Sequence, residues 1–338
     1  MYFSNKSAFL LTFSVMVLFG CESEGVFTAG ENIKQPASSA AKLFYIDVTP
    51  RTTLTSFPVQ YTAIGKYDDG TEADISGLVN WNMVTPNVAS FTPEGLARPK
   101  GVGVTKITAN LDGITSDEVS LTVRQSMVCG HQLGNFLDTG PNGGINDTDL
   151  NNAAGNCLKI REVVDPDDNK TKWFTSTPSD VVMAELGYIE QHNATNSGDS
   201  YAFDWQNTNP TGRFALFRQD GENVTLPGDG NDADAGVGGQ YDRWCKKLSA
   251  LNFAGQSNWR RATIEELFAL NVTRNGVDFG WPNDPGYFSA TLFGEAPLQD
   301  HYRILYIELD LPDDFAVCNS PAANAASAHY ASCVSKLE

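Results

Sequence analysis

Apolar and polar residues alternate along a series of short segments between residues 43 and 124, and this pattern limits the fold more than any other feature of the chain. The clearest apolar faces are Val59, Tyr61 and Ala63, then Ile107, Ala109 and Leu111, then Val119, Leu121 and Val123. Turn sequences such as Asp69-Gly70 and Asp112-Gly113 separate the segments. Since successive side chains of a strand point to opposite faces, the pattern predicts half-buried antiparallel strands that pack as an all-β sandwich.

The chain changes in character over residues 125–338, where long loops and helical spacing replace the alternation. Apolar residues recur at intervals of three and four in residues 179–192 and 240–253, which predicts two amphipathic helices. A third helix is expected to begin near residue 263, and strand-like segments surround the helices. We therefore expect an α+β region with much irregular loop.

The third helix is preceded by the densest group of charges, in the sequence SNWRRATIEELFAL over residues 257–270. Thr263 and Glu266 have the spacing of a capping box, in which each side chain bonds the backbone N–H of the other residue. Trp259 is expected in the core, while Arg260 and Arg261 are expected to neutralise the glutamates or a nearby acidic loop. This structural interpretation explains nearly every residue, and direct contact with a ligand is the alternative.

Residues 1–20 have the pattern of an export signal, with an apolar run that is too short to span a bilayer. The run ends in Leu-Phe-Gly-Cys, which resembles the bacterial lipoprotein box and implies acylation of Cys21; an ordinary secretory signal is the alternative. Acyl chains would attach the protein to a membrane, and Glu22 favours the outer membrane. Residues 21–42 are polar and rich in small residues, which predicts a flexible tether and a lipoprotein exposed at the cell surface.

Charge and motifs argue against two classes of function. The formal net charge of −18 leaves no basic face for nucleic acid, so no nucleic-acid partner is expected. The four histidines are scattered, and the sequence has no G-x-S-x-G elbow or Gly-rich phosphate loop. The chain is therefore predicted not to be an enzyme.

Residues 43–123 resemble the bacterial immunoglobulin-like domain of group 2. The resemblance rests on the order of the strand-like segments IDVTP, YTAIGKYDDGTEADIS and VNWNMVTPNVASFTPEGLA, including the Y-D-G-T hairpin and the strand tryptophan, Trp81. It implies that residues 43–124 form an immunoglobulin-like stalk or binding module.

Residues 125–338 resemble a C-type-lectin-like family, the C-terminal domain of bacterial collagen-like adhesins. The resemblance rests on a helix with a cysteine in its middle, then W-R-x-x-T-x-x-E-L, then GWPNDPGYFSAT and the terminal YASCV. The part that precedes residue 240 resembles the distal domains of invasin- and intimin-like adhesins. Arg261 and Ala262 stand where most members carry Leu-Pro, and Phe288 and Ala290 replace a tryptophan and a serine. The whole chain is thus expected to be an immunoglobulin-like sandwich followed by an α+β C-type-lectin-like domain.

The lectin-like resemblance also implies a disulfide pattern. In such folds a cysteine of the first helix pairs with one in the last strand, which implies Cys245–Cys333 here, and Cys129–Cys157 would form the second pair. Cys318 is then left over, either free or in competition with Cys129 or Cys157. An exported protein in an oxidising compartment is expected to form such bonds.

Two groups of residues are candidates for ligand and ion binding. Exposed aromatic and polar side chains could form a platform for a glycan or another ligand, and the candidates are Trp281, Asn283, Asp284, Tyr287 and Arg261. The alternative for the aromatic rings is that they close the core of the C-terminal region. Oxygen donors alternate as in calcium sites at Asp147, Asp149 and Asn151, and again at Asp229, Asp232 and Asp234. Neither acidic segment completes an EF-hand, so calcium is a candidate cofactor and solvated acidic turns are the alternative.

The combined expectation is a surface-facing lipoprotein in which an immunoglobulin-like stalk presents a lectin-like tip to a glycan or protein receptor. A structural or assembly role in an envelope complex is the first alternative. An enzyme of the formylglycine-generating type, to which the lectin-like family is distantly related, is the second.

Overall fold

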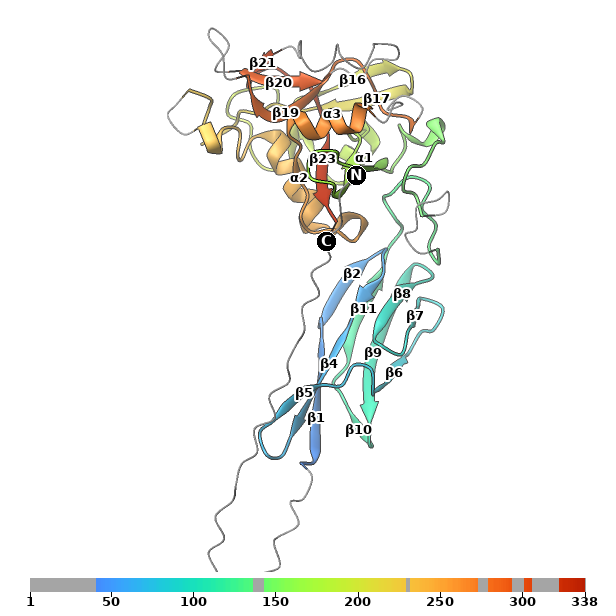
Figure 1. Cartoon of the computed structure of the whole chain (residues 1–338). Coiled ribbons are helices and arrows are strands. Elements are labelled where there is room, and N and C mark those ends of the chain that lie inside the picture. Colours follow the sequence, from blue (N-terminus) through green and yellow to red (C-terminus); the bar gives the residue numbers. More distant parts are fainter. Residues whose placement is uncertain are drawn as a thin grey trace, which may run out of the picture. The chain divides into compact units, whose positions relative to one another are not determined.

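The computed structural model describes residues 41–135, 143–228, 232–272, 279–293, 301–305 and 322–337. Strands dominate these residues and helices are few, which confirms the prediction of a β-rich chain (Figure 1). From Ala41 onward the chain forms one compact unit.

The N-terminal region, residues 41–124, consists of strands that form three small sheets. The strands are β1 (Leu43–Thr49), β2 (Thr52–Thr55), β3 (Val59–Gln60), β4 (Thr62–Tyr67), β5 (Glu72–Asp74), β6 (Asn80–Met83), β7 (Ala89–Phe91), β8 (Leu96–Pro99), β9 (Gly103–Leu111), β10 (Ile114–Thr115) and β11 (Val119–Val123). The sheet orders are β1-β4-β5, β3-β8-β7 and β10-β9-β11-β2, with β6 paired to β9. All pairs are antiparallel except β2 with β11, which run parallel.

The apolar faces predicted from alternation form the core of this region. Tyr61, Ile107 and Leu121 are fully buried, and they belong to one hydrophobic cluster. Trp81 and Phe91 stack on each other with ring centroids 5.1 Å apart, and each meets Tyr61 edge-on. The alternation therefore gave both the strands and their inward faces correctly.

In the C-terminal region, residues 125–338, the described residues form four sheets. The strands are β12 (Ile160–Val164), β13 (Thr171–Thr175), β14 (Ile189–Glu190), β15 (Ser200–Tyr201), β16 (Phe203–Thr208), β17 (Thr211–Leu216), β18 (Arg260–Arg261), β19 (Tyr287–Leu292), β20 (His301–Leu305), β21 (Ala322–Asn324), β22 (Tyr330–Ala331) and β23 (Cys333–Lys336). The sheet orders are β12-β13-β23-β18, β21-β20-β19-β22, β14-β15 and β16-β17.

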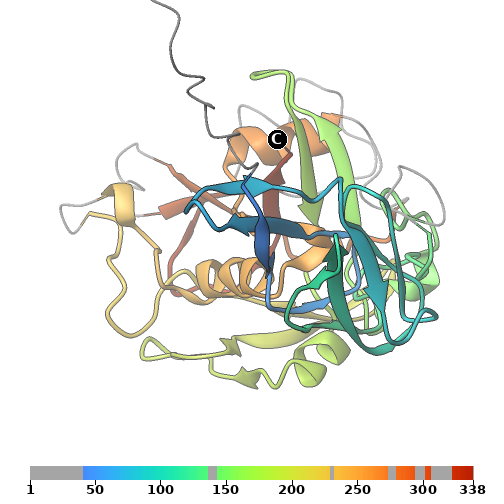
Figure 2. The same cartoon turned by 90° about the horizontal axis from the view of Figure 1, so that it is seen from below.

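Among the residues that the structure describes, three α-helices and three short 3-10 helices accompany these sheets. The α-helices are α1 (Asp180–Glu185), α2 (Gln240–Ala250) and α3 (Ile264–Val272), and the 3-10 helices are η1 (Leu150–Asn152), η2 (Asp232–Asp234) and η3 (Phe253–Gly255). Seen from below, α2 and α3 are two separate coils of the C-terminal region (Figure 2). Both lie where apolar spacing predicts them, although α2 ends three residues earlier than residue 253.

The helix predicted over residues 179–192 is much shorter than expected. Ser179 caps it by accepting a hydrogen bond from the Val182 N–H, as its sequence suggests. Gly187 then adopts a left-handed conformation with φ of 74°, and the Tyr188 N–H donates to the Met183 carbonyl at 2.9 Å. This is a Schellman ending, so α1 stops before Gly187 and the chain continues as strand β14.

Two disulfides join distant parts of the C-terminal region. Cys129 bonds Cys157, and Cys245 of α2 bonds Cys333 of β23. These are the two pairs that the lectin-like resemblance implied. Cys21 and Cys318 lie outside the described residues.

Candidate functional site

The charged segment before α3 builds the start of that helix. The Thr263 N–H donates to Glu266 Oε2 at 3.0 Å, and the Glu266 N–H donates to the Thr263 hydroxyl at 3.3 Å. Trp259 is 3% exposed, and its indole N–H donates to the Phe253 carbonyl. The capping box and the buried tryptophan are therefore present as predicted from the sequence.

Glu266 is also the centre of a buried ionic cluster. Both of its carboxylate oxygens accept from the Arg260 guanidinium, at 2.7 and 2.8 Å, and Oε1 accepts from the Lys172 ammonium at 2.9 Å. Lys172 in turn donates to Asp165 at 2.6 Å. Burial alone would raise the pKa of Glu266, but the hydrogen bonds from Arg260 and the Thr263 N–H outweigh it and lower the pKa to about 2. The cluster ties α3 to strand β13.

Arg261 serves the interior rather than a ligand. Its side chain is 9% exposed, and its guanidinium donates to Gln219 Oε1 at 2.7 Å and to the Ala235 carbonyl at 3.0 Å. Asp242 of α2 lies 3.7 Å away. Arg261 thus holds the segment around Ala235 against α2, and it does not neutralise the glutamates as Arg260 does.

The segment proposed as a ligand platform is largely core. Trp281 and Tyr287 are 0% and 1% exposed, and their ring centroids lie 5.7 Å apart. Asn283 is half-buried, and Asp284 is exposed. The two aromatic rings therefore stabilise the fold. Of the four candidate residues in this segment, only Asn283 and Asp284 are accessible to solvent.

A lysine occupies the first acidic loop in which calcium was a candidate. The Lys159 ammonium donates to Asp147 Oδ2 at 2.7 Å and to the carbonyls of Asp147 and Asp149 at 3.3 and 2.5 Å. Lys159 is 1% exposed. Asn151 points its amide and its backbone N–H at Asp149 Oδ1 instead of offering an oxygen to an ion. The Lys159 ammonium therefore supplies the positive charge inside this loop.

The second acidic segment is partly described. Asp232 and Asp234 lie on the 3-10 helix η2, where Asp232 accepts from the Gly228 N–H at 2.8 Å. Asp229 lies outside the described residues. Within the described ranges, no group of three or more His, Cys, Asp and Glu side chains is arranged to hold a metal ion.

The histidines occupy unrelated environments. His131 stacks on Phe57 with ring centroids 4.7 Å apart, and His192 meets Phe203 edge-on at 5.1 Å. His329 lies against Phe288, and burial lowers its pKa to about 4. None of these three contacts brings a histidine to another titratable side chain.

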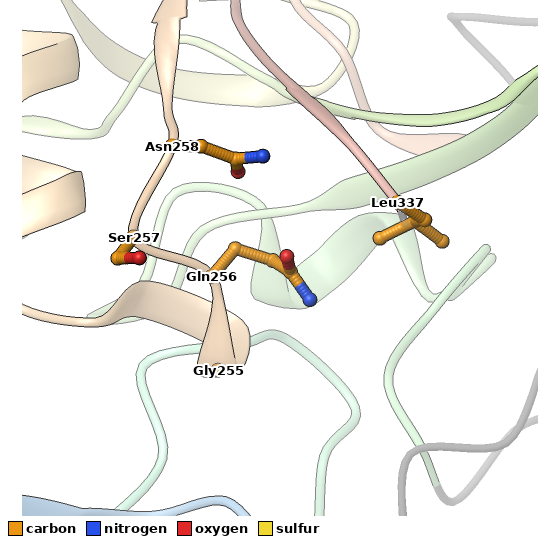
Figure 3. Close-up of a pocket in the computed structure, with 5 residues that line it drawn as sticks. All are labelled: Gly255, Gln256, Ser257, Asn258 and Leu337. Carbon is orange, nitrogen blue, oxygen red and sulfur yellow. The ribbon is translucent and has the colours of Figure 1, made fainter.

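A polar pocket lies between the loop after α2 and the end of β23. Its lining is Gly255, Gln256, Ser257, Asn258 and Leu337, and its volume is about 420 Å³. Figure 3 shows the amides of Gln256 and Asn258 on the side of the pocket where Leu337 lies. The Asn258 amide donates to the Lys336 carbonyl at 2.9 Å. The pocket offers no aromatic or charged side chain, and one of its amides already holds the last strand.

The hairpin of β16 and β17, two strands that lie side by side in Figure 1, exposes a tryptophan. Trp205 is 46% exposed, whereas Trp173, Trp244, Trp259 and Trp281 are at most 7% exposed and Trp81 is half-buried. Trp205 pairs across the hairpin with the buried Phe214, and Phe44 of β1 is another exposed aromatic residue, at 58%. An exposed tryptophan is costly to leave in water and typical of contact surfaces.

The polar side chains of the hairpin lie on its other face. Arg213 forms an ion pair with Asp204, and the Gln206 amide donates to the carbonyls of Asn207 and Gly212 at 3.1 and 3.2 Å. Because successive side chains of a strand point to opposite faces, Trp205 shares a face with its cross-strand partner Phe214, and the polar side chains share the opposite face.

The sequence does not single out Trp205. Residues 201–205 read Tyr-Ala-Phe-Asp-Trp, an alternation of aromatic rings typical of a strand with one apolar face. That signal predicts burial for all three rings, and it holds for Tyr201 at 7% exposed. Phe203 is half-buried and Trp205 is exposed, so burial of the three rings decreases from Tyr201 to Trp205.

Comparison with known proteins gives one partial relationship. No protein-family model matches the chain. Part of the chain is similar to Ice-binding protein 1 of Shewanella frigidimarina (strain NCIMB 400), with 28% identity over 176 residues. The similarity covers 51% of this chain but only 18% of that protein, so the chain spans less than a fifth of its length. None of the helices that the structure describes is long and apolar enough to cross a membrane.

Proposed function

We propose that this chain is a non-catalytic binding protein of the cell surface. Its N-terminal region serves as an immunoglobulin-like stalk, and its C-terminal region is a C-type-lectin-like tip that binds a glycan or protein receptor. The observation that carries the proposal is the exposed ring of Trp205 on the hairpin of β16 and β17. Tryptophan and arginine dominate the energetics of contact surfaces, and aromatic rings presented on rigid strands lose little entropy on binding.

Three features support the lectin-like tip. A disulfide joins α2 to the last strand, β18 pairs with that strand, and α3 begins with the capping box. Tyr241 strengthens the same junction because its hydroxyl donates to the Ser332 carbonyl at 2.5 Å and accepts from the Ala262 N–H at 3.1 Å. These bonds provide a stiff support for loops and hairpins that face solvent.

We also propose that the chain has no catalytic activity. The polar side chains best placed for chemistry have structural partners: Glu266 with Arg260 and Lys172, and Arg261 with Gln219. His329 is held neutral at pH 7 among aromatic rings. A general acid or base needs a pKa near the working pH and access to substrate, and these buried groups offer neither.

We also propose that the chain is anchored to the outer membrane through acylated Cys21. Two or more acyl chains attach a protein stably, while residues 21–42 provide the tether. Replacement of Cys21 by serine should release the protein from the membrane fraction of the producing cells. If the variant stays in that fraction as the wild type does, the lipid anchor is wrong.

A binding screen with the purified full chain tests the proposed function. Glycan arrays and surface-protein arrays should give a hit that Trp205→Ala abolishes and Val164→Ala leaves unchanged. Val164 is a matched control because it is a comparably exposed apolar residue, at 57%, on another strand of the C-terminal region. Co-purification with an envelope complex through a Trp205-independent contact would favour the assembly role instead.

A second candidate function is ice binding, favoured by the outward face of the sheet β10-β9-β11-β2. Leu54, Thr122 and Val104 lie side by side across three strands, and Leu54 and Val104 are 50% and 57% exposed. Thr52, Ser120 and Lys106 form the adjacent row. Outward faces of such sheets are usually polar, whereas this one presents methyl groups and hydroxyls in regular rows. The partly similar protein is named for binding ice.

An ice recrystallisation assay tests this second candidate. The full chain should slow crystal growth, and Val104→Lys should remove the effect because a charged side chain interrupts the row. Val164→Lys is the control, since Val164 and Val104 are equally exposed at 57%. If Val104→Lys and Val164→Lys lose the effect equally, or if the wild type does not slow crystal growth, ice binding is ruled out.

A further inference from the structure

We propose that Asn169, in the loop between β12 and β13, is a site of N-linked glycosylation. The inference goes beyond receptor binding and rests on the export proposed above, because N-linked glycans are added to exported chains. The acceptor pattern is Asn, any residue except proline, then Ser or Thr, and residues 169–171 read Asn-Lys-Thr. The group transferred is an oligosaccharide that is delivered on a polyprenyl pyrophosphate carrier.

The residue two positions before Asn169 distinguishes it from the other acceptor patterns of the sequence. Bacterial oligosaccharyl transferases recognise an acidic side chain at that position, where a carboxylate pairs with a cationic side chain of the enzyme. Asp167 provides this carboxylate. The other patterns begin at Asn5, Asn146, Asn193, Asn223 and Asn271, and none of them has Asp or Glu two positions earlier. The sequence therefore favours Asn169.

The loop that contains Asn169 is closed by hydrogen bonds of its own. The Asp165 N–H donates to the Lys170 carbonyl at 2.9 Å, and the Asn169 N–H donates to the Asp165 carbonyl at 2.8 Å. The buried Asp165 carboxylate also accepts from the Asp167 N–H at 2.9 Å. Asp168 Oδ1 accepts from the Lys170 N–H at 3.0 Å. The loop therefore keeps its shape through Asp165, Asp168 and its backbone.

The side chains of Asp167 and Asn169 take no part in this framework. Both residues are exposed, and within the described ranges neither side chain has a hydrogen bond or an ion pair. Asn169 has a φ of 53°, a left-handed conformation that asparagine tolerates better than most residues. The carboxamide that reacts and the carboxylate that is recognised are thus both presented to solvent.

Other acceptor patterns in the described part of the chain provide internal comparisons. Asn146 Oδ1 accepts from the Glu162 N–H at 3.0 Å, so this carboxamide is already used by the fold. Asn193 Oδ1 accepts from the Thr195 N–H and hydroxyl at 3.0 and 3.1 Å. Asn223 is exposed but lacks the acidic residue. Asn223 is therefore a matched control for exposure without the carboxylate.

The transfer step needs no oxidant or reductant. The Asn169 Nδ2 atom forms a bond to the anomeric carbon of the oligosaccharide, and the bond from that carbon to the pyrophosphate oxygen breaks. The polyprenyl pyrophosphate leaves with the electron pair, and one amide proton passes to a base of the transferase. Thr171 is the first residue of β13 and pairs with Val164, so this end of the hairpin must open or be still unfolded during transfer. Because Asn169 is exposed, the folded chain then carries the glycan without losing a contact.

The test uses the full chain purified from the cells that naturally produce it, followed by trypsin digestion and mass spectrometry with fragmentation that keeps the glycan attached. The peptide of residues 162–170 should be heavier by a whole number of sugar residues, and the added mass should lie on Asn169. Asn169→Asp and Asp167→Asn should remove the added mass, whereas Thr171→Ser should keep it. Asn223→Gln is the control and should leave the glycan in place.

Other results overturn the inference in distinguishable ways. If the wild-type peptide is unmodified while the protein is in the membrane fraction, the glycosylation is wrong and the proposed anchor stands. If the protein is unmodified and stays in the cytoplasm, both proposals fail. Added mass on Thr171, or an Asp167→Asn variant that is glycosylated like the wild type, refutes the assignment. Thermal melting shows whether each variant folds, and Asp167→Asn keeps the test valid if Asn169→Asp is unstable.

Discussion

Replacement of Glu266 by glutamine tests the ionic cluster that fixes α3. Glutamine also serves in capping boxes, so the substitution preserves the shape and removes the charge. The pKa of Glu266 falls from 4.5 to about 2 in the folded chain, and one pKa unit corresponds to about 1.4 kcal/mol. The carboxylate therefore contributes about 3 kcal/mol to the free energy of unfolding at pH 7. Glu266 is 5% exposed, but the side chain of its partner Arg260 is 51% exposed, so solvent screens part of this contribution and about 3 kcal/mol is its upper value.

Urea unfolding with disulfides intact measures this effect. At pH 7 we expect Glu266→Gln to lower the free energy of unfolding by about 2 to 3 kcal/mol. Glu265→Gln is the control: Glu265 lies in the same helical turn, is exposed, and should change stability by about 0.5 kcal/mol or less. Because the folded pKa is depressed, the stabilisation is present above pH 4.5 and disappears as pH falls through about 2. If the two variants are equally stable at pH 7, or if the difference persists at pH 2, the account of the cluster is refuted.

Three further predictions follow from buried groups. His329 has a pKa of about 4 in the folded chain and 6.5 in the unfolded chain, so the free energy of unfolding should fall by about 2 kcal/mol more in the wild type than in His329→Gln between pH 6.5 and pH 4. Urea unfolding at several pH values measures this, and parallel pH curves for the two proteins would contradict it. Calcium and EDTA should leave the melting temperature of the wild type unchanged because Lys159 neutralises Asp147, whereas Lys159→Met should lower the melting temperature by several degrees. A calcium-dependent shift of the wild-type melting temperature would contradict this prediction. Replacing both Cys245 and Cys333 by serine should lower the free energy of unfolding by up to about 4.6 kcal/mol, because the disulfide closes a long loop. Unchanged stability in urea unfolding would show that the disulfide does not stabilise the fold.

Regular periodicity made much of the fold predictable from the sequence. Period-two alternation located the strands around Tyr61, Ile107 and Leu121, because a buried face allows only one register. The capping box located the start of α3, because Thr263 and Glu266 satisfy each other locally. Local rules hold where neighbours in sequence provide the partners.

Other features did not follow from the sequence. Helix α1 stops at a left-handed Gly187, a local stop signal that conflicts with the apolar spacing through residue 192. Lys159 fills the loop of Asp147 from 12 positions away, a pairing that no local motif indicates. For Trp281 and Tyr287 the sequence left both a ligand platform and the core open, and the structure places both rings in the core.

The most direct measurement is the affinity of the purified full chain for the glycan or protein found in the array screen, compared between the wild type and Trp205→Ala by calorimetric titration. We expect saturable binding by the wild type, a loss of at least about 30-fold in the variant, and the same melting behaviour for both. Equal affinities in the two proteins would contradict the proposal that Trp205 is part of the binding site.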